Sequence, residues 1–192
     1  MRNGGRLPRI IAGSGKGRRL KAPAGDATRP TGARVRQTLF DILAAAIPEG
    51  RFLDAFAGGG GVGLEALSRG ARRVVLVDES RAAVEAVRAN LALLPDAARA
   101  EVLQKDARIA LAALRDRGER FDVVYLDPPY GSDLYEPLLP LAEAVLAQDG
   151  VIVAEHFHKR ALPERMGRLV NTRSVRVGDH RLTFYRKTEE PD

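Results

Sequence analysis

The stretch FLDAFAGGGGVGLEAL, residues 52–67, decides the fold. An apolar strand near 51–56 runs into a cluster of glycines, and a helical pattern follows near 62–69. Glycines let the backbone turn sharply and approach a ligand closely. A strand, a glycine loop and a helix in this order predict the first unit of a nucleotide-binding α/β fold. The loop is not a P-loop, because no Gly-Lys-Ser/Thr follows its glycines.

The chain around this stretch alternates strands with helices. The other strands are expected near 73–77, 100–104, 121–126 and 150–154, and the other helices near 80–94, 107–117 and 134–147. Such alternation predicts a parallel sheet with right-handed crossovers. After Glu155 the pattern changes, because two extended segments, 167–177 and 181–186, flank Gly178-Asp179-His180. These segments predict an antiparallel hairpin at the edge of the sheet.

Acidic residues stand at the ends of successive predicted strands. Asp54 ends the first strand, and Asp78 ends the second, 18 residues after Gly60. Folds of this kind place a carboxylate near that position to bind ribose hydroxyls. Asp106 follows the next apolar stretch, where an acid would lie near an adenine. Each acid alone could be a helix N-cap, but their repetition at strand ends favours a nucleoside-containing cofactor.

The acid before the glycines separates two kinds of cofactor. In the NAD fingerprint the first glycine directly follows the strand, whereas here the order is D-x-x-x-G-x-G, which resembles the S-adenosylmethionine loop of class I methyltransferases. A cationic sulfonium tolerates a nearby acid better than a pyrophosphate does. We therefore expect a class I, Rossmann-like fold with a mostly parallel seven-stranded sheet and S-adenosyl-L-methionine as cofactor. The expected cofactor-binding residues are Asp54, Phe56, Ala57, Gly58, Gly60, Asp78 and Asp106.

The fourth predicted strand ends in Asp127-Pro128-Pro129-Tyr130. The Asp127 carboxylate can accept a hydrogen bond from an amino group. The two prolines lack N–H groups and have fixed φ, so they stiffen the loop and leave carbonyls facing the site. Tyr130 offers a flat face on which a base can stack. A Pro-rich turn is the plain alternative, but the upstream cofactor loop favours a grip on the exocyclic amine of a nucleobase.

The net charge of +6 is unevenly distributed. Residues 1–36 carry ten basic side chains and one acidic one, whereas the remaining chain carries 21 basic and 24 acidic ones. A local concentration of this kind predicts a nucleic-acid-binding surface; a solvated basic tail is the alternative. The segment contains a predicted β-hairpin with its turn at 14–17, and then a helix over 32–46. The cations expected to bind RNA, of which Arg34 and Arg36 lie off the apolar stripe of this helix, are Arg9, Lys16, Arg18, Arg19, Lys21, Arg29, Arg34 and Arg36.

Length and composition exclude several classes of protein. A chain of 192 residues supports one compact α/β domain with a small appendage. No apolar run approaches the roughly 20 residues that cross a bilayer, and no signal peptide is visible. Without cysteine there is no disulfide, thiol nucleophile or Cys-ligated zinc. His156 and His158 are expected to be solvated loop residues rather than metal ligands. We expect a cytoplasmic monomer that binds neither a metal nor a membrane.

The chain resembles the RsmD-like family of 16S ribosomal RNA guanine-N2 methyltransferases over nearly its whole length. The motifs that carry the resemblance are R-I-I-A-G (9–13), G-R-R-L (17–20), T-R-P-T (28–31), R-V-R-Q-T-L-F (34–40), D-A-F-A-G (54–58), G-L-E-A-L-S-R-G (63–70) and D-P-P-Y (127–130). Two positions depart from the pattern: Gly59 replaces a small polar residue, and Asp78 stands where many relatives carry Glu. Residues 1–31 would then be a basic extension and residues 32–192 the methyltransferase domain.

The resemblance implies that one guanine of small-subunit rRNA, of the guanine 966 type, accepts the methyl group. The catalytic loop would be Asp127, Pro128, Pro129 and Tyr130. Guanine N2 is a poor nucleophile because its lone pair is delocalised into the ring. Asp127 and the Pro128 carbonyl would accept its two N–H bonds and align the lone pair for in-line displacement. The substrate is naked rRNA, a partial ribonucleoprotein or an assembled subunit.

Three alternatives remain open at this point. A DNA adenine-N6 methyltransferase uses the same loop, although it usually needs a sequence-reading domain for which this chain has little room. A non-catalytic RNA-binding assembly factor explains the basic segment but leaves the cofactor loop unexplained. An NAD oxidoreductase explains the glycines but not D-P-P-Y.

Overall fold

A computed structural model describes residues 8–24, 32–129 and 133–188 of the chain. Its centre is an eight-stranded sheet in the order β3-β2-β1-β4-β5-β8-β7-β6. The strands are β1 (Arg51–Asp54), β2 (Arg73–Asp78), β3 (Ala100–Gln104), β4 (Phe121–Leu126), β5 (Leu146–Phe157), β6 (Arg165–Met166), β7 (Leu169–Val177) and β8 (His180–Lys187). The helices are α1 (Ala33–Ile42), α2 (Gly63–Ser68), α3 (Arg81–Leu91), α4 (Ala107–Asp116) and α5 (Tyr135–Val145), with a short 3-10 turn at Ala97–Arg99.

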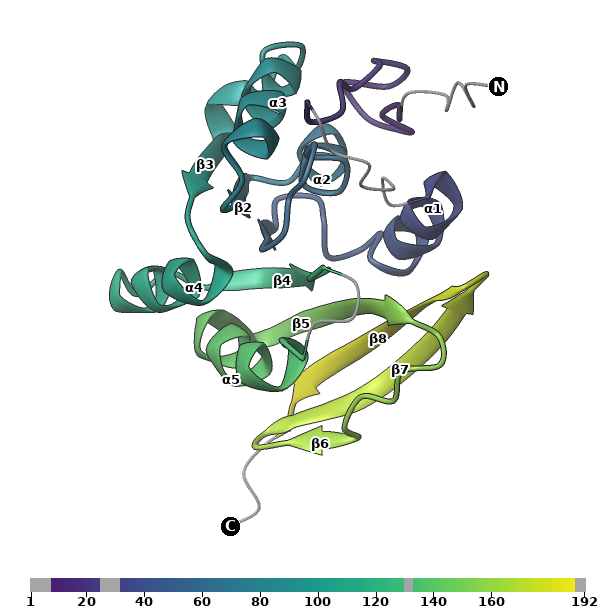
Figure 1. Cartoon of the computed structure of the whole chain (residues 1–192), viewed down its shortest axis with the longest axis vertical. Helices are drawn as coiled ribbons and strands as arrows, with labels where there is room; N and C mark the ends of the chain where they lie inside the picture. Colours follow the sequence, from purple (N-terminus) through teal and green to yellow (C-terminus); the bar gives the residue numbers. More distant parts are fainter. Residues whose placement is uncertain (1–7, 25–31, 130–132, 189–192) are drawn as a thin grey trace.

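The five strands β1 to β5 pair in parallel, and β8, β7 and β6 continue the sheet in antiparallel fashion. The predicted fold class is therefore confirmed. The expected seven strands are present, and the two-residue β6 adds an eighth at the edge. In Figure 1 the antiparallel strands β7 and β8 extend beside β5, away from β3.

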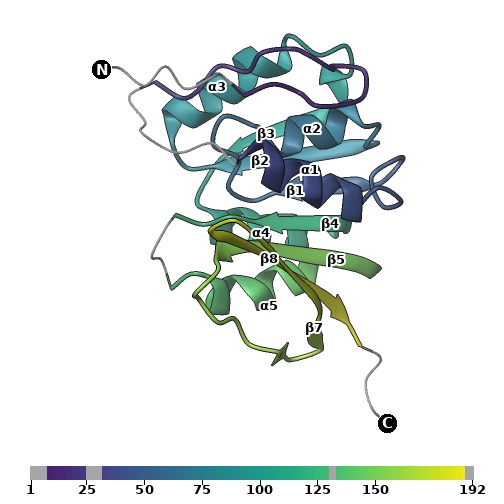
Figure 2. The same cartoon turned by 90° about the vertical axis from the view of Figure 1, so that its right-hand side faces the viewer.

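Helices cover both faces of the sheet (Figure 2). One core joins α1, α2 and α3 to side chains such as Phe52 and Tyr125, and the other joins α4 and α5 to side chains such as Leu53 and Val124. Successive residues of β1 thus point into different cores. Parallel strands buried on both faces read as continuous apolar runs, which explains why β2 and β4 could be predicted from composition alone.

The order of the strands indicates where a ligand-binding crevice lies. The chain moves from β1 outward to β2 and β3, then returns to β4 on the other side of β1. In open α/β sheets such a reversal leaves a crevice beyond the carboxyl ends of the two neighbouring strands. Asp54 ends β1 and Asp127 directly follows β4, so both acids lie at this switch point.

The described part of the basic extension packs onto the sheet domain. Residues 8–20 form a hairpin-like loop with a single bridge between Arg9 and Arg19. Ile10 and Leu20 are buried in the core shared with α1 and α2. Gly13 lies so close to helix α2 that an added Cβ would approach the Ser68 carbonyl oxygen to 1.7 Å. The division of the chain at residue 31 stays a prediction, since residues 25–31 lie outside the described part.

No helix in the described part of the chain combines the length and the apolar composition that crossing a membrane requires.

Candidate active site

Asp54 is the most deeply buried acid at the switch point, with a relative exposure of 1%. Its Oδ2 accepts a hydrogen bond from the Gly63 N–H at 2.9 Å. Its Oδ1 is buried and has no partner among the described residues. Burial raises the pKa of Asp54 to about 7, against the opposing effect of the hydrogen bond from the Gly63 N–H. The protein therefore holds a carboxylate that would gain from a nearby cation.

Asp78 connects the end of β2 to the glycine loop. Its Oδ2 accepts a hydrogen bond from the Gly58 N–H at 2.8 Å, and its Oδ1 accepts one from the Ser80 N–H at 2.9 Å. Gly58 has φ +52°, and a Cβ added there would meet no atom of the described residues within 4 Å. The loop thus opens toward free space beside an oriented carboxylate, as a site for a ribose requires.

The other residues expected to bind the cofactor lie in the glycine loop between β1 and α2. Phe56 is half-buried, and Ala57 is buried with its N–H donating to the Val77 carbonyl at 2.8 Å. Gly60, with φ +84°, donates its N–H to the Ala57 carbonyl at 2.7 Å. These bonds join the loop to β2 and fix its turn. Their contacts with a cofactor stay a prediction.

Two buried side chains tie the glycine loop to the basic extension. Asn90 of α3 donates Nδ2 to the carbonyls of Gly59 and Lys21, both at 2.9 Å. Arg36 of α1 donates Nη1 to the Gly61 carbonyl at 3.3 Å and Nη2 to the Arg9 carbonyl at 2.9 Å. The extension therefore supports the glycine loop.

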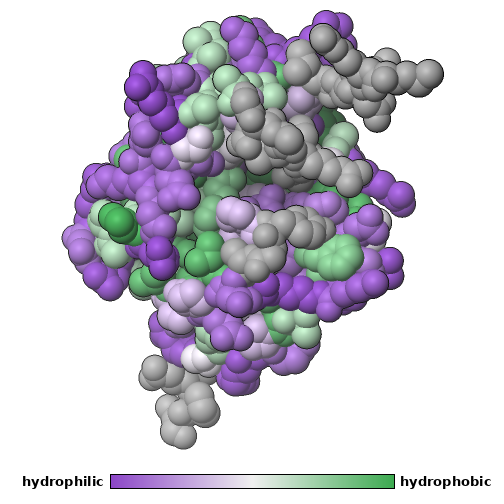
Figure 3. All heavy atoms as spheres, in the orientation of Figure 1, coloured by the Kyte–Doolittle hydropathy of each residue, from purple (hydrophilic) through white to green (hydrophobic). Residues whose placement is uncertain are grey.

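The expectation that Arg36 stays available for RNA is wrong. Its side chain is only 2% exposed, because the hairpin-like loop covers the flank of α1 that the helical pattern left open. Arg34, on the same helix, is exposed. Arg9, Lys16, Arg18, Arg19 and Lys21 are also exposed, whereas Arg29 lies outside the described residues. Hydrophilic side chains dominate the face shown in Figure 3.

Asp106 is an N-cap. It follows β3 by two residues and accepts hydrogen bonds from the backbone N–H groups of Arg108 and Ile109 at 2.9 and 3.3 Å. The Arg108 guanidinium also pairs with its carboxylate, and these contacts lower the pKa of Asp106. These contacts are those of a helix N-cap. A role of Asp106 near the adenine of a cofactor stays a prediction.

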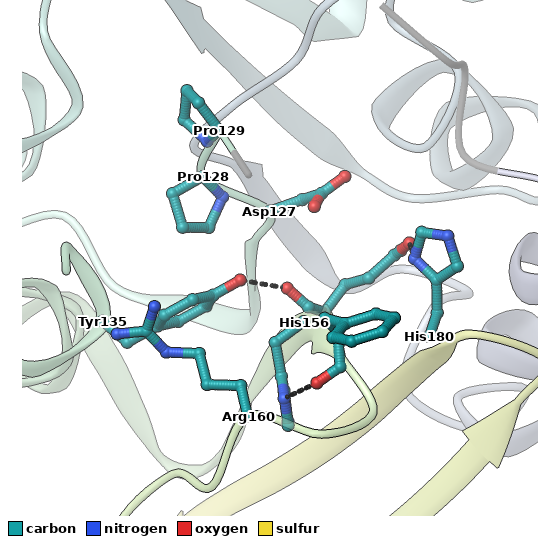
Figure 4. A pocket seen from close by; sticks show the side chains of 9 residues that line it. Asp127, Pro128, Pro129, Tyr135, His156, Arg160 and His180 are labelled. Atoms are coloured by element: carbon teal, nitrogen blue, oxygen red, sulfur yellow. Dashed lines mark hydrogen bonds and ion pairs between the residues drawn. The ribbon is translucent and has the colours of Figure 1, made fainter. Parts of the chain in front are cut away.

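Asp127, Pro128 and Pro129 line a pocket at the carboxyl end of β4. Its other walls come from Tyr135 of α5, the end of β5, Arg160 and His180. In Figure 4 the Asp127 carboxylate and the His180 ring lie on one side, and Tyr135 and Arg160 lie on the other. The Arg160 guanidinium lies 5.0 Å from the centre of the Tyr135 ring. Tyr130, the expected stacking residue, lies outside the described residues.

A buried network that the sequence did not reveal forms the floor of this pocket. Glu155 of β5 is 1% exposed and accepts a hydrogen bond from the Tyr125 hydroxyl. The Glu155 Oε1 lies 2.7 Å from Nδ1 of His180. The Tyr135 hydroxyl donates to the Glu155 backbone carbonyl. Burial and the neighbouring Glu155 carboxylate raise the pKa of Tyr125 well above its usual value, so Tyr125 acts as a proton donor here.

The signal for Glu155 was present in the sequence. It comes directly after a run of apolar residues, as Asp54 does. His180 could not be found in this way, because antiparallel pairing of β5 with β8 brings it to Glu155 from a distant part of the chain. The expectation of a solvated loop was wrong for His156, which lies in β5, is 4% exposed and places Nε2 2.8 Å from Thr183 Oγ1. Burial lowers the pKa of His156.

A family model described as "Conserved hypothetical protein 95" (Cons_hypoth95) matches residues 8–186. YlbH of Bacillus subtilis (strain 168) is 42% identical over 181 residues, which are 93% of this chain and 98% of that protein. Ribosomal RNA small subunit methyltransferase D of Escherichia coli (strain K12) is 39% identical over 157 residues, which are 81% of this chain and 77% of that protein.

Solved structures agree with this similarity. The structure of yhhF from Escherichia coli aligns with a TM-score of 0.81 and 36% identity over 93% of this chain and 97% of that one. SMU.776, solved in complex with SAH, aligns with a TM-score of 0.65 and 15% identity over 82% of this chain and 50% of that one. At that identity SMU.776 shows a shared fold alone.

Proposed function

The chain belongs to the RsmD-like family of ribosomal RNA methyltransferases, and from this premise we propose that it methylates the exocyclic N2 of a guanine in small-subunit rRNA, at a guanine 966-type site. The observation that carries the proposal is the position of two loops. β1 and β4 are neighbours, with Asp54 paired in register with Tyr125, so Asp127 lies two residues beyond that pair. Neighbouring strands lie about 4.8 Å apart. The cofactor loop and the acceptor loop therefore leave the sheet side by side.

The cofactor is S-adenosyl-L-methionine, and the residues present fit it. When bound, it supplies a methyl group on a cationic sulfonium. Asp78 would hold the ribose hydroxyls, since its carboxylate is already oriented by Gly58 and Ser80. The buried, unpaired Oδ1 of Asp54 would face positive charge at favourable energy. Gly58 leaves room for a close approach of the ligand to the backbone.

The acceptor amine would be held by Asp127 and the carbonyl of Pro128. Accepting both N–H bonds of N2 turns its lone pair toward the methyl carbon, and correct orientation can contribute up to about 7–11 kcal/mol to such a reaction. The target guanine must leave its stack to reach this pocket, which requires a few kcal/mol. Tyr130 would offset part of that penalty by stacking, at roughly 1–3 kcal/mol per base.

We infer that His180, beside Glu155, receives the proton, because both residues line the acceptor pocket. A bond forms between N2 and the methyl carbon, the carbon–sulfur bond breaks with its electrons remaining on sulfur, and N2 then loses a proton. His180 Nδ1 lies 2.7 Å from Glu155 Oε1. A neutral His180 with its proton on Nδ1 would carry its lone pair on Nε2, which could accept the proton from N2. Asp127 would orient the amine and His180 would take the proton, so two residues that line the same pocket would have different roles.

Labelled methyl transfer tests the substrate class. The protein and methyl-labelled S-adenosyl-L-methionine are incubated in separate reactions with each acceptor. The acceptors are small-subunit RNA or particles, large-subunit RNA, and duplex DNA. We expect label in the small-subunit samples only. Label in duplex DNA would favour the adenine-N6 alternative. Cofactor binding in calorimetry without transfer to any of these would favour a non-catalytic assembly factor.

A further inference from the structure

A polar groove continues from the acceptor pocket along the antiparallel strands. Its lining comes from the loop after β5, from β7 and from β8. His156 and Arg160 line both the groove and the pocket, so the two are contiguous. Ile152 and Ala154 of β5 lie in the core with α5, and His156 is the next residue on that side of the strand. The face of the sheet therefore changes from apolar to polar where the groove begins.

The floor of the groove is a chain of hydrogen bonds across three strands. Nη1 of Arg181 lies 3.2 Å from the Ser174 hydroxyl, which lies 3.4 Å from the Thr183 hydroxyl. Thr183 in turn contacts Nε2 of His156 at 2.8 Å. These side chains keep one another oriented, so the groove presents a fixed polar surface. Such a surface suits an occupant that is itself polar.

The charge of the groove is positive. Lys159, Arg160 and Arg181 line it, against the carboxylate of Glu164. Arg160 also pairs with the exposed carboxylate of Asp133 at 3.1 Å, which leaves Lys159 and Arg181 as the cations that exceed the acids of the groove. Nε of Arg181 is buried and has no acceptor among the described residues, so the protein does not saturate this guanidinium. An anion is the occupant that this charge favours.

We propose that this groove binds the phosphates of the RNA nucleotides that flank the target guanine. The inference rests on the proposed function. A guanine held beside Asp127 remains attached to its backbone, and that backbone must leave the pocket through an open side. The groove opens there and supplies the cations and hydroxyls that commonly contact phosphate oxygens. RNA is thus held by two separate surfaces, the groove and the exposed cations of the N-terminal extension.

Arg181→Gln and Lys159→Gln test the groove in the full-length protein. Filter binding of small-subunit RNA is measured between low and high salt, because each lost phosphate contact reduces the salt slope by about 0.7–0.9. We expect each variant to lower affinity severalfold at low salt, to flatten the slope by about one contact and to leave cofactor affinity unchanged. Lys159 is exposed and free of the floor network, so its variant remains informative if Arg181→Gln folds poorly.

Arg120→Gln is the matched control. Arg120 is exposed and lies at the amino end of β4, whereas the acceptor pocket lies beyond the carboxyl end of that strand. Its loss removes one charge and should change neither slope nor affinity. Unchanged RNA binding by both groove variants would overturn the proposal that the groove binds phosphates, and it would leave the proposed function intact. If the wild type transferred no methyl group to RNA, the proposed function would fail. The salt slopes of RNA binding would still show whether the groove binds phosphates.

Discussion

Asn90 donates a hydrogen bond from Nδ2 to the carbonyl oxygen of Gly59 at 2.9 Å, which ties helix α3 to the glycine loop. The same amide accepts the Lys21 N–H at 2.7 Å and donates to the Lys21 carbonyl at 2.9 Å. A single buried side chain therefore holds the basic extension and the glycine loop together. If the glycine loop binds the cofactor as proposed, the extension helps to shape that site.

Asn90→Ala should weaken both folding and cofactor binding. Removing the amide leaves partly buried backbone groups of Lys21 and Gly59 without this partner, at about 1–3 kcal/mol of unfolding free energy. Urea unfolding and calorimetry with S-adenosylhomocysteine measure the two effects. Glu85→Ala on the exposed side of α3 is the control. Cofactor affinity equal to that of the wild type would show that this bond does not shape the loop.

Cofactor affinity should rise with pH through Asp54. Its pKa is raised to about 7 by burial, so the carboxyl is mostly neutral at pH 6 and mostly charged at pH 8. A cationic ligand favours the charged form, and affinity for S-adenosyl-L-methionine should be about tenfold lower at pH 6 than at pH 8. Asp54→Asn should remove this dependence. A wild-type profile that stays flat between pH 6 and pH 8 would place the cationic ligand away from Asp54.

Asp127→Ala should reduce turnover by about 100-fold or more, because the acceptor amine loses its orientation. Cofactor affinity should hardly change. Asp127→Asn should keep part of the activity, since its amide oxygen still accepts one hydrogen bond. Single-turnover rates and calorimetry separate the two effects. Near wild-type turnover by Asp127→Ala would show that D-P-P-Y is a structural turn without a catalytic role.

The exposed cations of the extension should carry part of the affinity for RNA. Deleting residues 1–24 is unsuitable as a test, because it removes Ile10 and Leu20 from the core. Replacing Lys16, Arg18 and Arg19 by Gln leaves the core intact and should flatten the salt slope by up to about 2–3. The same number of charges removed at Arg115, Arg117 and Arg120 is the control. Equal slopes for the two triple variants would make the extension a scaffold for the cofactor loop only.

Local patterns predicted the fold well, because apolar runs and glycines act within a few residues. The end of β1 at Asp54, the glycine turn and the position of Asp127 after β4 were all found in this way. Residues whose surroundings come from distant segments were missed. Arg36 was judged by its place on a helix, but the hairpin-like loop buries it. His180 reaches Glu155 only through the pairing of β5 with β8.

Nucleoside analysis of the methylated RNA tests the central claim most directly. Small-subunit RNA and particles are methylated with labelled S-adenosyl-L-methionine, digested to nucleosides and separated against standards. The account predicts that the label migrates as N2-methylguanosine and is lost with Asp127→Ala. Label in N6-methyladenosine, or in guanosine methylated at another atom, would contradict it.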